Sequence, residues 1–200
     1  MYCVGLTGTI ASGKTTALSS FDDLGINTIS ADAIARQITH SEPAVLQAIR
    51  AYFGNAVFLP TGELNRRALR TLVFSNPIQR QWLEKLLHPR IKQRIQAEIE
   101  RATTSYCVIE IPLLFNRCDF PYINRVLLIT ADEATLLTRV MTRDKCSKDD
   151  AVAVLKSQPD EDSRKKIADD IVINNQDPEV LKESIKQLHE QYLLLSKRPI

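Results

Sequence analysis

The chain has 200 residues, of which 44% are hydrophobic and 25% are charged, and its formal net charge is +2. This length suits one domain, or one domain with inserted lobes, and the composition excludes a disordered or fibrous chain. The charge is too balanced to support nucleic-acid or membrane binding by itself, so any bound anion must be held by a local site.

The four cysteines form no C-x-x-C pair and no Cys/His cluster at zinc spacing. Cys3 and Cys107 lie in apolar runs, so we expect reduced thiols that pack as small hydrophobic groups. No basic leader with a long apolar stretch opens the sequence, and no apolar run approaches the ~20 residues that span a bilayer. We therefore expect a cytoplasmic protein that binds neither membranes nor nucleic acid.

Short apolar runs alternate with longer stretches of helical period, which predicts an α/β chain with a parallel sheet. The expected strands are 2–6, 26–30, 106–111, 126–130 and 171–173. A glycine-bearing segment and a helix that Gly25 ends follow the first of these strands.

The long stretch between the second and third expected strands has the pattern of helices. These are 44–53, 65–74, 78–87 and 91–102, with breaks at Asn76-Pro77 and at His88-Pro89. The stretch is too long for a simple crossover and predicts an inserted helical lobe. A second, charge-rich insertion covers about 139–168, where Ser147-x-x-Asp150 predicts a helix start, and 178–196 predicts an amphipathic packing helix.

The segment Gly8-Thr9-Ile10-Ala11-Ser12-Gly13-Lys14-Thr15 matches G-x-x-x-x-G-K-[ST] at every defined position. Such a loop curls backbone N–H groups around a polyphosphate and aims a helix N-terminus at its charge. A chance match in a strand-to-helix turn is the alternative, but the flanking strand and helix favour a nucleoside triphosphate site. Lys14 is expected to reach the β/γ oxygens, and the Thr15 hydroxyl to ligate Mg²⁺. The expected nucleotide-binding residues of the loop are Gly8, Ala11, Ser12, Gly13, Lys14, Thr15 and Thr16.

Switch GTPases, mechanical ATPases and small-molecule kinases share such a loop. A GTPase should carry N-K-x-D after a late strand, where this chain has Asn174-Asn175-Gln176-Asp177. A mechanical ATPase usually has an acid after an apolar strand, whereas Glu110 is embedded in the run 107–111. A kinase needs an acid that can take the acceptor's proton and arginines that close over the transferring group.

Three residues suit the kinase requirements. Asp32 follows the second strand at the edge where ligands bind in doubly wound sheets, although it can equally cap a helix that begins near Ala33. Arg139 and Arg143, at i and i+4, share one helix face, which is either a phosphate-binding pair or a solvated surface.

Taken together, short strings along the chain resemble the dephospho-coenzyme A kinase family over essentially all 200 residues. The strings are Leu6-Thr7-Gly8 with the phosphate loop, Gly25-Ile26, Ser30-Ala31-Asp32 with Ala35-Arg36, Leu64-Asn65-Arg66, Leu87-His88-Pro89, Ile111-Pro112-Leu113-Leu114-Phe115, Arg139 with Arg143-Asp144, Gln158, Ala168-Asp169-Asp170 and Ile173-Asn174-Asn175. Their order and spacing make the resemblance specific.

The resemblance implies a three-layer αβα fold of the P-loop NTPase type with three parts. A nucleotide-binding core covers 1–31, 104–138 and 169–200, a helical acceptor lobe covers 32–103, and a lid covers 139–168. It implies ATP and dephospho-coenzyme A as substrates, Mg²⁺ as cofactor, and phosphorylation of the ribose 3′-hydroxyl. We expect a monomer or a small homo-oligomer.

The resemblance also implies roles for single residues. Asp32 is the base at the 3′-hydroxyl, and Arg139 and Arg143 are lid arginines. Arg66 and His88 occupy acceptor-lobe positions, although His88 can instead satisfy a buried helix end. Asn174 and Asn175 form either a loop beside the adenine or a plain turn.

The chain departs from the family pattern at three positions. Thr9 and Ala11 replace two loop glycines, which lowers the expected flexibility of the loop, and Asn116 replaces a frequent acid. Glu110 lies close to an acid of some relatives and is a candidate magnesium ligand through water. Two alternatives stay open: another P-loop kinase of nucleoside monophosphate or shikimate type, and a non-catalytic nucleotide-binding protein.

Overall fold

The computed structural model describes the chain except residues 159–160 and 198–200. The chain folds into two compact units, one of Met1–Ser30 with Ile99–Ile200 and one of Ala31–Glu98, and each is described by itself. The three-part division expected from the sequence stays a prediction. Residues 159–160 of the expected lid and 198–200 of the expected core lie outside the described residues.

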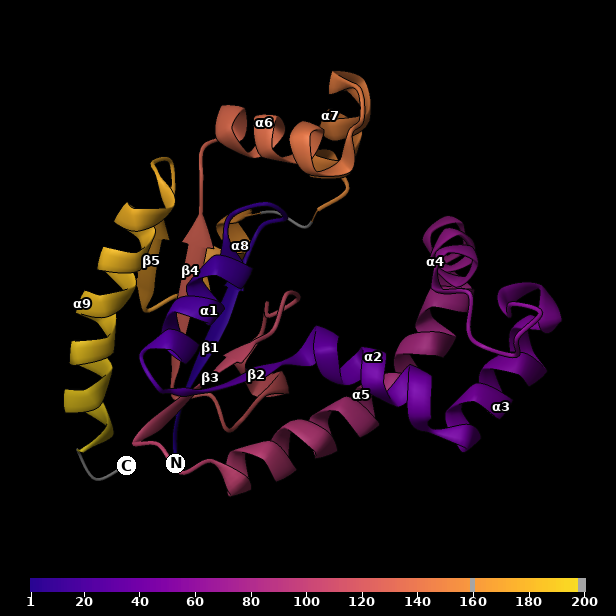
Figure 1. Ribbon diagram of the computed structural model, residues 1–200, viewed down its shortest axis with the longest axis horizontal. Coiled ribbons are helices and arrows are strands. Elements are labelled where there is room, and N and C mark those ends of the chain that lie inside the picture. The colour runs from indigo at the N-terminus through magenta and orange to yellow at the C-terminus, as the bar shows by residue number, and fades with distance from the viewer. Residues whose placement is uncertain (159–160, 198–200) are drawn as a thin grey trace. The chain divides into compact units, whose positions relative to one another are not determined.

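The first unit is built on a five-stranded parallel sheet with the strand order β2-β3-β1-β4-β5 (Figure 1). The strands are β1 (Tyr2–Gly8), β2 (Asn27–Ser30), β3 (Tyr106–Glu110), β4 (Arg125–Thr130) and β5 (Asp170–Ile173). Each predicted strand is confirmed to within two residues at either end. The central strand is β1, so the phosphate loop that follows it leaves the middle of the sheet.

Helices lie on both sides of this sheet, and α1 (Lys14–Asp23) packs with α9 (Pro178–Ser196) on one face (Figure 1). The rings of Phe21 from α1 and Tyr192 from α9 stack with centroids 6.1 Å apart, and Tyr106 of β3 meets Phe21 edge-on at 6.3 Å. These aromatic side chains fill the core between the two helices and the sheet. The amphipathic terminal helix predicted for 178–196 is therefore confirmed.

The remaining helices of the first unit follow β3 and β4. They are the 3₁₀ turn η2 (Arg117–Asp119), α6 (Glu133–Asp144), α7 (Lys148–Lys156) and α8 (Glu161–Ile167). The predicted start of α7 forms a capping box, in which Ser147 Oγ accepts from the Asp150 N–H and the Asp150 carboxylate accepts from the Ser147 N–H. Helix α8 contacts β1, which leads into the phosphate loop, and β4, which pairs with β1.

The second unit is helical and has its own apolar core. Its helices are α2 (Ala31–Ser41), α3 (Pro43–Phe53), η1 (Asn55–Val57), α4 (Arg66–Ser75) and most of α5 (Pro77–Arg101). The core residues are Ile34, Ile38, Val45, Ile49, Val57, Leu69 and Ile95. The predicted insertion after the second strand is therefore a compact body rather than a crossover.

Two features of the helices differ from the sequence prediction by more than one residue. The break predicted at His88-Pro89 is wrong, because α5 continues from Pro77 to Arg101 with Pro89 inside it. A proline removes one intrahelical hydrogen bond, and the buried Ile95 and Ile99 secure the turns that follow it. Helix α2 begins at Ala31 rather than near Ala33, so Asp32 lies in its first turn and is not its N-cap.

Cys3 and Cys107 are both buried and lie opposite each other on β1 and β3, with their Sγ atoms 3.4 Å apart. They pack as small apolar groups, as predicted. Within the described residues, no helix has both the length and the apolar character that crossing a membrane requires.

The proline inside α5 gives a test of the fold. We expect Pro89→Ala to raise the free energy of unfolding by roughly 1–3 kcal/mol, because alanine restores the missing N–H and removes the clash with the preceding turn. Urea denaturation followed by circular dichroism measures the change. The exposed Gln93→Ala in the same helix is the control, expected within about 0.5 kcal/mol of the parent. A Pro89→Ala chain less stable than the parent contradicts this account.

Candidate active site

The phosphate loop joins the end of β1 to the start of α1. Gly13 is the N-cap residue of α1 with φ +105°, a left-handed conformation that favours glycine. At Gly8 a Cβ would lie 2.1 Å from the carbonyl oxygen of Ile129 on β4, so only glycine fits there. Both glycines of the motif are thus required by this backbone, and the loop runs directly into a helix N-terminus.

Lys14 folds back over the loop that precedes it. Its Nζ donates to the carbonyl oxygens of Gly8 at 2.9 Å and Thr9 at 2.8 Å. The ammonium group therefore stands at the mouth of the loop, where phosphate oxygens can replace the carbonyls. The Ser12 Oγ is buried and has no hydrogen-bond partner within the part of the chain that the structure describes. Thr15 follows on α1 with an exposed side chain.

Ala11 takes a position where the family commonly has glycine. Its φ is +61°, in the left-handed region, which costs a residue with a Cβ about 1–2 kcal/mol. Alanine at this position is therefore accommodated in a left-handed conformation, at the expense of local strain.

The loop after β5 packs against the phosphate loop. Asn174 is 7% exposed, and its Nδ2 donates to the Ser12 carbonyl oxygen at 2.8 Å. Asn175 is exposed, and its Oδ1 accepts from the Asp132 N–H at 2.8 Å. The structure thus brings Asn174 to the phosphate loop and leaves the neighbouring Asn175 at the surface.

The two arginines of α6 have different surroundings. Arg139 is half-buried, and its Nη1 donates to the Asn174 carbonyl oxygen at 3.0 Å. Arg143 is exposed and makes two hydrogen bonds of 2.8 Å to the adjacent Asp144 carboxylate, which raises the pKa of Arg143. Arg139 is therefore attached to the loop that contacts the phosphate loop, whereas Arg143 points to solvent beside Asp144.

Two acids lie at the carboxyl ends of neighbouring strands. Glu110 is the last residue of β3, buried at 8% exposure, and its Oε2 accepts from Ser30 Oγ at 2.9 Å. The apolar run continues past it, since Ile111 is buried and its N–H donates to the Leu6 carbonyl oxygen at 2.9 Å. Asp32 is exposed in the first turn of α2, two residues after the end of β2. A carboxylate there interacts favourably with the helix dipole.

The acceptor-lobe candidates lie in the second unit. Arg66 begins α4 and joins it to α2, since its guanidinium donates to Thr39 Oγ1 at 2.9 Å and to the Arg36 carbonyl oxygen at 2.8 Å. His88 is exposed in the interior of α5, so the alternative in which it satisfies a buried helix end is wrong.

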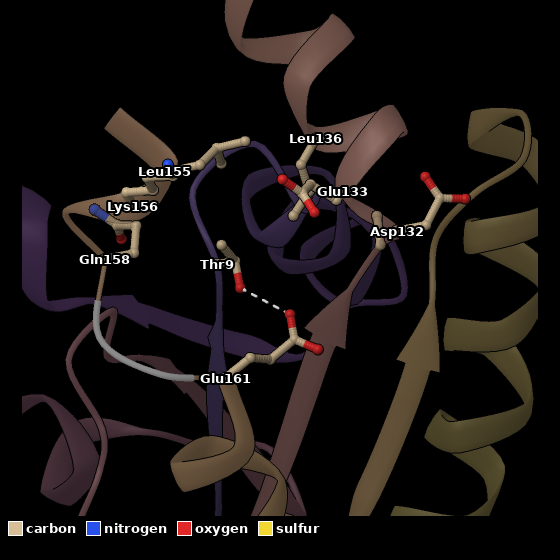
Figure 2. Close-up of a pocket in the computed structure, with 9 residues that line it drawn as sticks. Thr9, Asp132, Glu133, Leu136, Leu155, Lys156, Gln158 and Glu161 are labelled. Atoms are coloured by element: carbon tan, nitrogen blue, oxygen red, sulfur yellow. Dashed lines mark hydrogen bonds between the residues drawn. The ribbon is translucent and has the colours of Figure 1, made fainter. Parts of the chain in front are cut away.

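A pocket of about 440 Å³ opens beside the phosphate loop within the first unit (Figure 2). Its lining residues are Thr9, Ala131, Asp132, Glu133, Leu136, Leu155, Lys156, Gln158 and Glu161. Figure 2 shows the side chains of Thr9 and Glu161 pointing toward each other, and Thr9 Oγ1 donates to Glu161 Oε2 at 3.3 Å. The sequence analysis missed Glu161, because nothing local marks one acid within a charge-rich insertion.

Glu161 brings a negative charge to the phosphate loop. Burial raises the pKa of its carboxyl, but hydrogen bonds, foremost that from Lys165 at 2.9 Å, outweigh burial and hold this pKa below its usual value. Glu161 is therefore ionised at neutral pH. An anionic side chain bound to Thr9 opposes a polyphosphate that approaches the same loop.

These features define a class of protein. A G-x-x-x-x-G-K-T loop after the central strand of a parallel sheet, with a helix N-terminus at its end and a lysine at its mouth, is the nucleotide site of a P-loop kinase or a related P-loop protein. The described residues include no group of three or more His, Cys, Asp or Glu side chains arranged to hold a metal ion.

Sequence comparison identifies the family within this class. The family model "Dephospho-CoA kinase" matches residues 2–179. A dephospho-CoA kinase of Legionella pneumophila (strain Paris) is 45% identical over 98% of each chain. That of Escherichia coli (strain K12) is 40% identical over 98% of this chain and 96% of its own. The chain belongs to the dephospho-CoA kinase family.

Solved structures agree with this assignment. A dephospho-CoA kinase from Campylobacter jejuni has a TM-score of 0.62 and 28% identity, covering 94% of this chain and 96% of its own. The protein TT1252 from Thermus thermophilus has a TM-score of 0.80 and 29% identity, covering 95% and 97%. A shikimate kinase from Acinetobacter baumannii (TM-score 0.54, 11% identity, covering 99% and 96%) shares the fold. Membership of this family makes the chain a kinase.

The charge of Glu161 gives a prediction. We expect Glu161→Gln to tighten ATP binding by about two- to fivefold, because one negative charge beside the phosphate loop is removed. Isothermal titration calorimetry at low salt measures the dissociation constant, and the gain should shrink as salt is raised.

Asp162→Asn is the matched control. It removes the same charge from a side chain that is 73% exposed and belongs to the next residue of α8. An equal gain in ATP affinity in both variants, or weaker ATP binding in Glu161→Gln, contradicts the conclusion that the charge of Glu161 opposes ATP.

Proposed function

We propose that the chain transfers the γ-phosphoryl group of ATP to the ribose 3′-hydroxyl of dephospho-coenzyme A. The P–O bond between the γ-phosphorus and the β–γ bridging oxygen breaks, a bond from phosphorus to the 3′-oxygen forms, and the hydroxyl proton leaves. The products are ADP, coenzyme A and a proton. The observation that carries this proposal is the complete phosphate loop at the end of β1 in a chain that matches its family from residue 2 to 179.

Most catalysis of phosphoryl transfer is positioning and stabilisation of charge. In this proposal the loop from Gly8 to Thr16 holds the phosphates, and the Lys14 ammonium exchanges its two carbonyl partners for the β and γ oxygens. Arg139 and Arg143 neutralise charge that develops on the transferring group. Arg139 is already attached to the loop after β5, while Arg143 must leave Asp144 to take part.

Mg²⁺ is the proposed cofactor. The exposed Thr15 hydroxyl on the first turn of α1 is a hard oxygen donor beside the phosphate loop, which suits this ion. When bound, Mg²⁺ supplies positive charge to the β- and γ-phosphate oxygens. Buried Glu110, fixed by Ser30 at the end of β3, is the proposed partner of a water molecule bound to the ion.

Asp32 is the proposed base. Its carboxylate is exposed and follows β2, a strand that ends at the same edge of the parallel sheet as β1. It accepts the 3′-hydroxyl proton late in the reaction, since the transition state of phosphoryl transfer is loose.

The remaining proposals concern the binding of the two substrates. Arg66 and His88 of the helical unit are the proposed acceptor-binding residues, with His88 exposed and Arg66 anchored on α2. The loop of Asn174 and Asn175 is proposed to lie beside the adenine of ATP. The 139–168 segment is the proposed lid, which excludes water so that ATP is not hydrolysed. A cytoplasmic location and a monomeric or small homo-oligomeric state stay predictions.

The acceptor is tested by ADP release. We expect the parent chain to release ADP rapidly with ATP, Mg²⁺ and dephospho-coenzyme A, and only at background rate with AMP, with shikimate or with no acceptor. A coupled assay measures the rate, and Lys14→Ala is the inactive reference. Stimulation by AMP or shikimate favours another P-loop kinase, and no stimulation by any acceptor favours a nucleotide-binding protein.

The base assignment is tested by Asp32→Asn, which keeps the size of the side chain but cannot take a proton. We expect kcat to fall by about 10²-fold or more, with the ATP dissociation constant within about twofold of the parent. Steady-state kinetics and calorimetry measure the two quantities. Asp23→Asn, an exposed aspartate at the end of α1, is the control. A full-rate Asp32→Asn enzyme rules out Asp32 as the base.

A further inference from the structure

The side chain of Asn174 is hydrogen-bonded to the phosphate loop. It is almost fully buried, and its Nδ2 donates to the carbonyl oxygen of Ser12, 162 positions earlier in the chain, at 2.8 Å. Its own backbone is held on both sides, because its N–H donates to the Thr130 carbonyl oxygen at 2.7 Å and its carbonyl oxygen accepts from Arg139 at 3.0 Å. Asn174 is therefore a fixed donor aimed at one peptide group.

That peptide group joins Ser12 to Gly13. In a trans peptide the C=O and the N–H point in opposite directions within one plane. A donor that holds the Ser12 oxygen on the outer side of the loop therefore turns the Gly13 N–H to the inner side, where phosphate binds. The same hydrogen bond polarises the peptide and makes the Gly13 N–H a stronger donor.

The packing around Gly13 fixes this arrangement. A Cβ on Gly13 would lie 2.3 Å from Asn174 Nδ2 and 3.4 Å from Leu181 of α9. The asparagine amide therefore occupies the space that any side chain at position 13 would need.

We propose that Asn174 is a positioning residue of the phosphate loop, which acts through the Gly13 N–H on the polyphosphate and not through the base of the nucleotide. The proposal rests on the ATP site of the proposed function. It differs from a role beside the adenine, because the amide nitrogen of Asn174 is engaged by Ser12 and the residue is buried.

A ligand without a base separates the two roles. Inorganic tripolyphosphate carries the phosphates of ATP and nothing that an adenine loop can contact. We expect Asn174→Ala to weaken ATP and tripolyphosphate binding by the same factor, about three- to tenfold, the size that corresponds to one neutral hydrogen bond. Isothermal titration calorimetry measures both ligands, and Gln187→Ala, an exposed residue of α9 outside this loop, is the control. Weakened ATP binding with unchanged tripolyphosphate binding overturns the proposal, as does no change with either ligand.

Asn174→Asp provides a second variant of nearly the same size. Its carboxylate cannot donate to the Ser12 oxygen, so we expect a loss for both ligands at least as large as in Asn174→Ala. A variant that binds both ligands as the parent does overturns the proposal.

The parent chain alone also tests the idea. Ser12-Gly13 is the only Ser-Gly pair in the sequence, so labelling serine with carbonyl ¹³C and glycine with ¹⁵N gives one correlated amide signal, that of Gly13. We expect saturating tripolyphosphate to move this amide proton downfield, and to move it less in Asn174→Ala. A signal in the parent that does not respond to tripolyphosphate overturns the proposal.

These outcomes do not depend on the acceptor. If the parent binds tripolyphosphate through Gly13 but does not phosphorylate dephospho-coenzyme A, the proposed function fails while the role of Asn174 stands. If it phosphorylates dephospho-coenzyme A but Asn174 variants bind tripolyphosphate normally, only the role of Asn174 fails.

Discussion

Binding of a polyphosphate by this chain depends on backbone N–H groups that must point inward before the ligand arrives. The loop packs closely against two other segments of the first unit, which restricts its backbone. At Gly8 the backbone lies against the Ile129 carbonyl of β4, and at Gly13 it lies against Asn174 after β5. Neither position has space for a side chain, so the two motif glycines are required by neighbouring backbone and side-chain atoms as much as by the phosphate.

One positive and one negative side chain, Lys14 and Glu161, are hydrogen-bonded to this loop. Lys14 is held by two loop carbonyls, which are weaker partners than phosphate oxygens. Glu161 is ionised and bound to Thr9, so the loop carries a nearby negative charge that ATP must overcome. Lys14 attracts the phosphates and Glu161 repels them, and both effects grow with the charge of the ligand.

The sequence was sufficient for features that depend on local pattern and failed for those that depend on distant residues. The phosphate loop and the strands could be predicted, because each is encoded by residues adjacent in the chain. The continuous α5 could not, since a proline signals a break unless tertiary packing of Ile95 and Ile99 secures the helix beyond it. The contacts of Glu161 and Asn174 with the loop join residues 152 and 162 positions apart, and no spacing rule reaches so far.

Helix α8 is held differently at its two ends, which bears on how the proposed lid can open. At its C-terminal end the Arg117 guanidinium donates twice to the Ile167 carbonyl oxygen, at 3.1 and 2.7 Å, and also pairs with Asp169. At its N-terminal end the Glu161 carboxylate accepts a hydrogen bond of 3.3 Å from Thr9 Oγ1. All of these hydrogen bonds are charge-assisted, but those of Arg117 are shorter than that of Thr9 and are joined by an ion pair. We therefore expect α8 to separate from the phosphate loop before it separates from the sheet, so that opening proceeds about its Ile167 end and exposes Thr9 first.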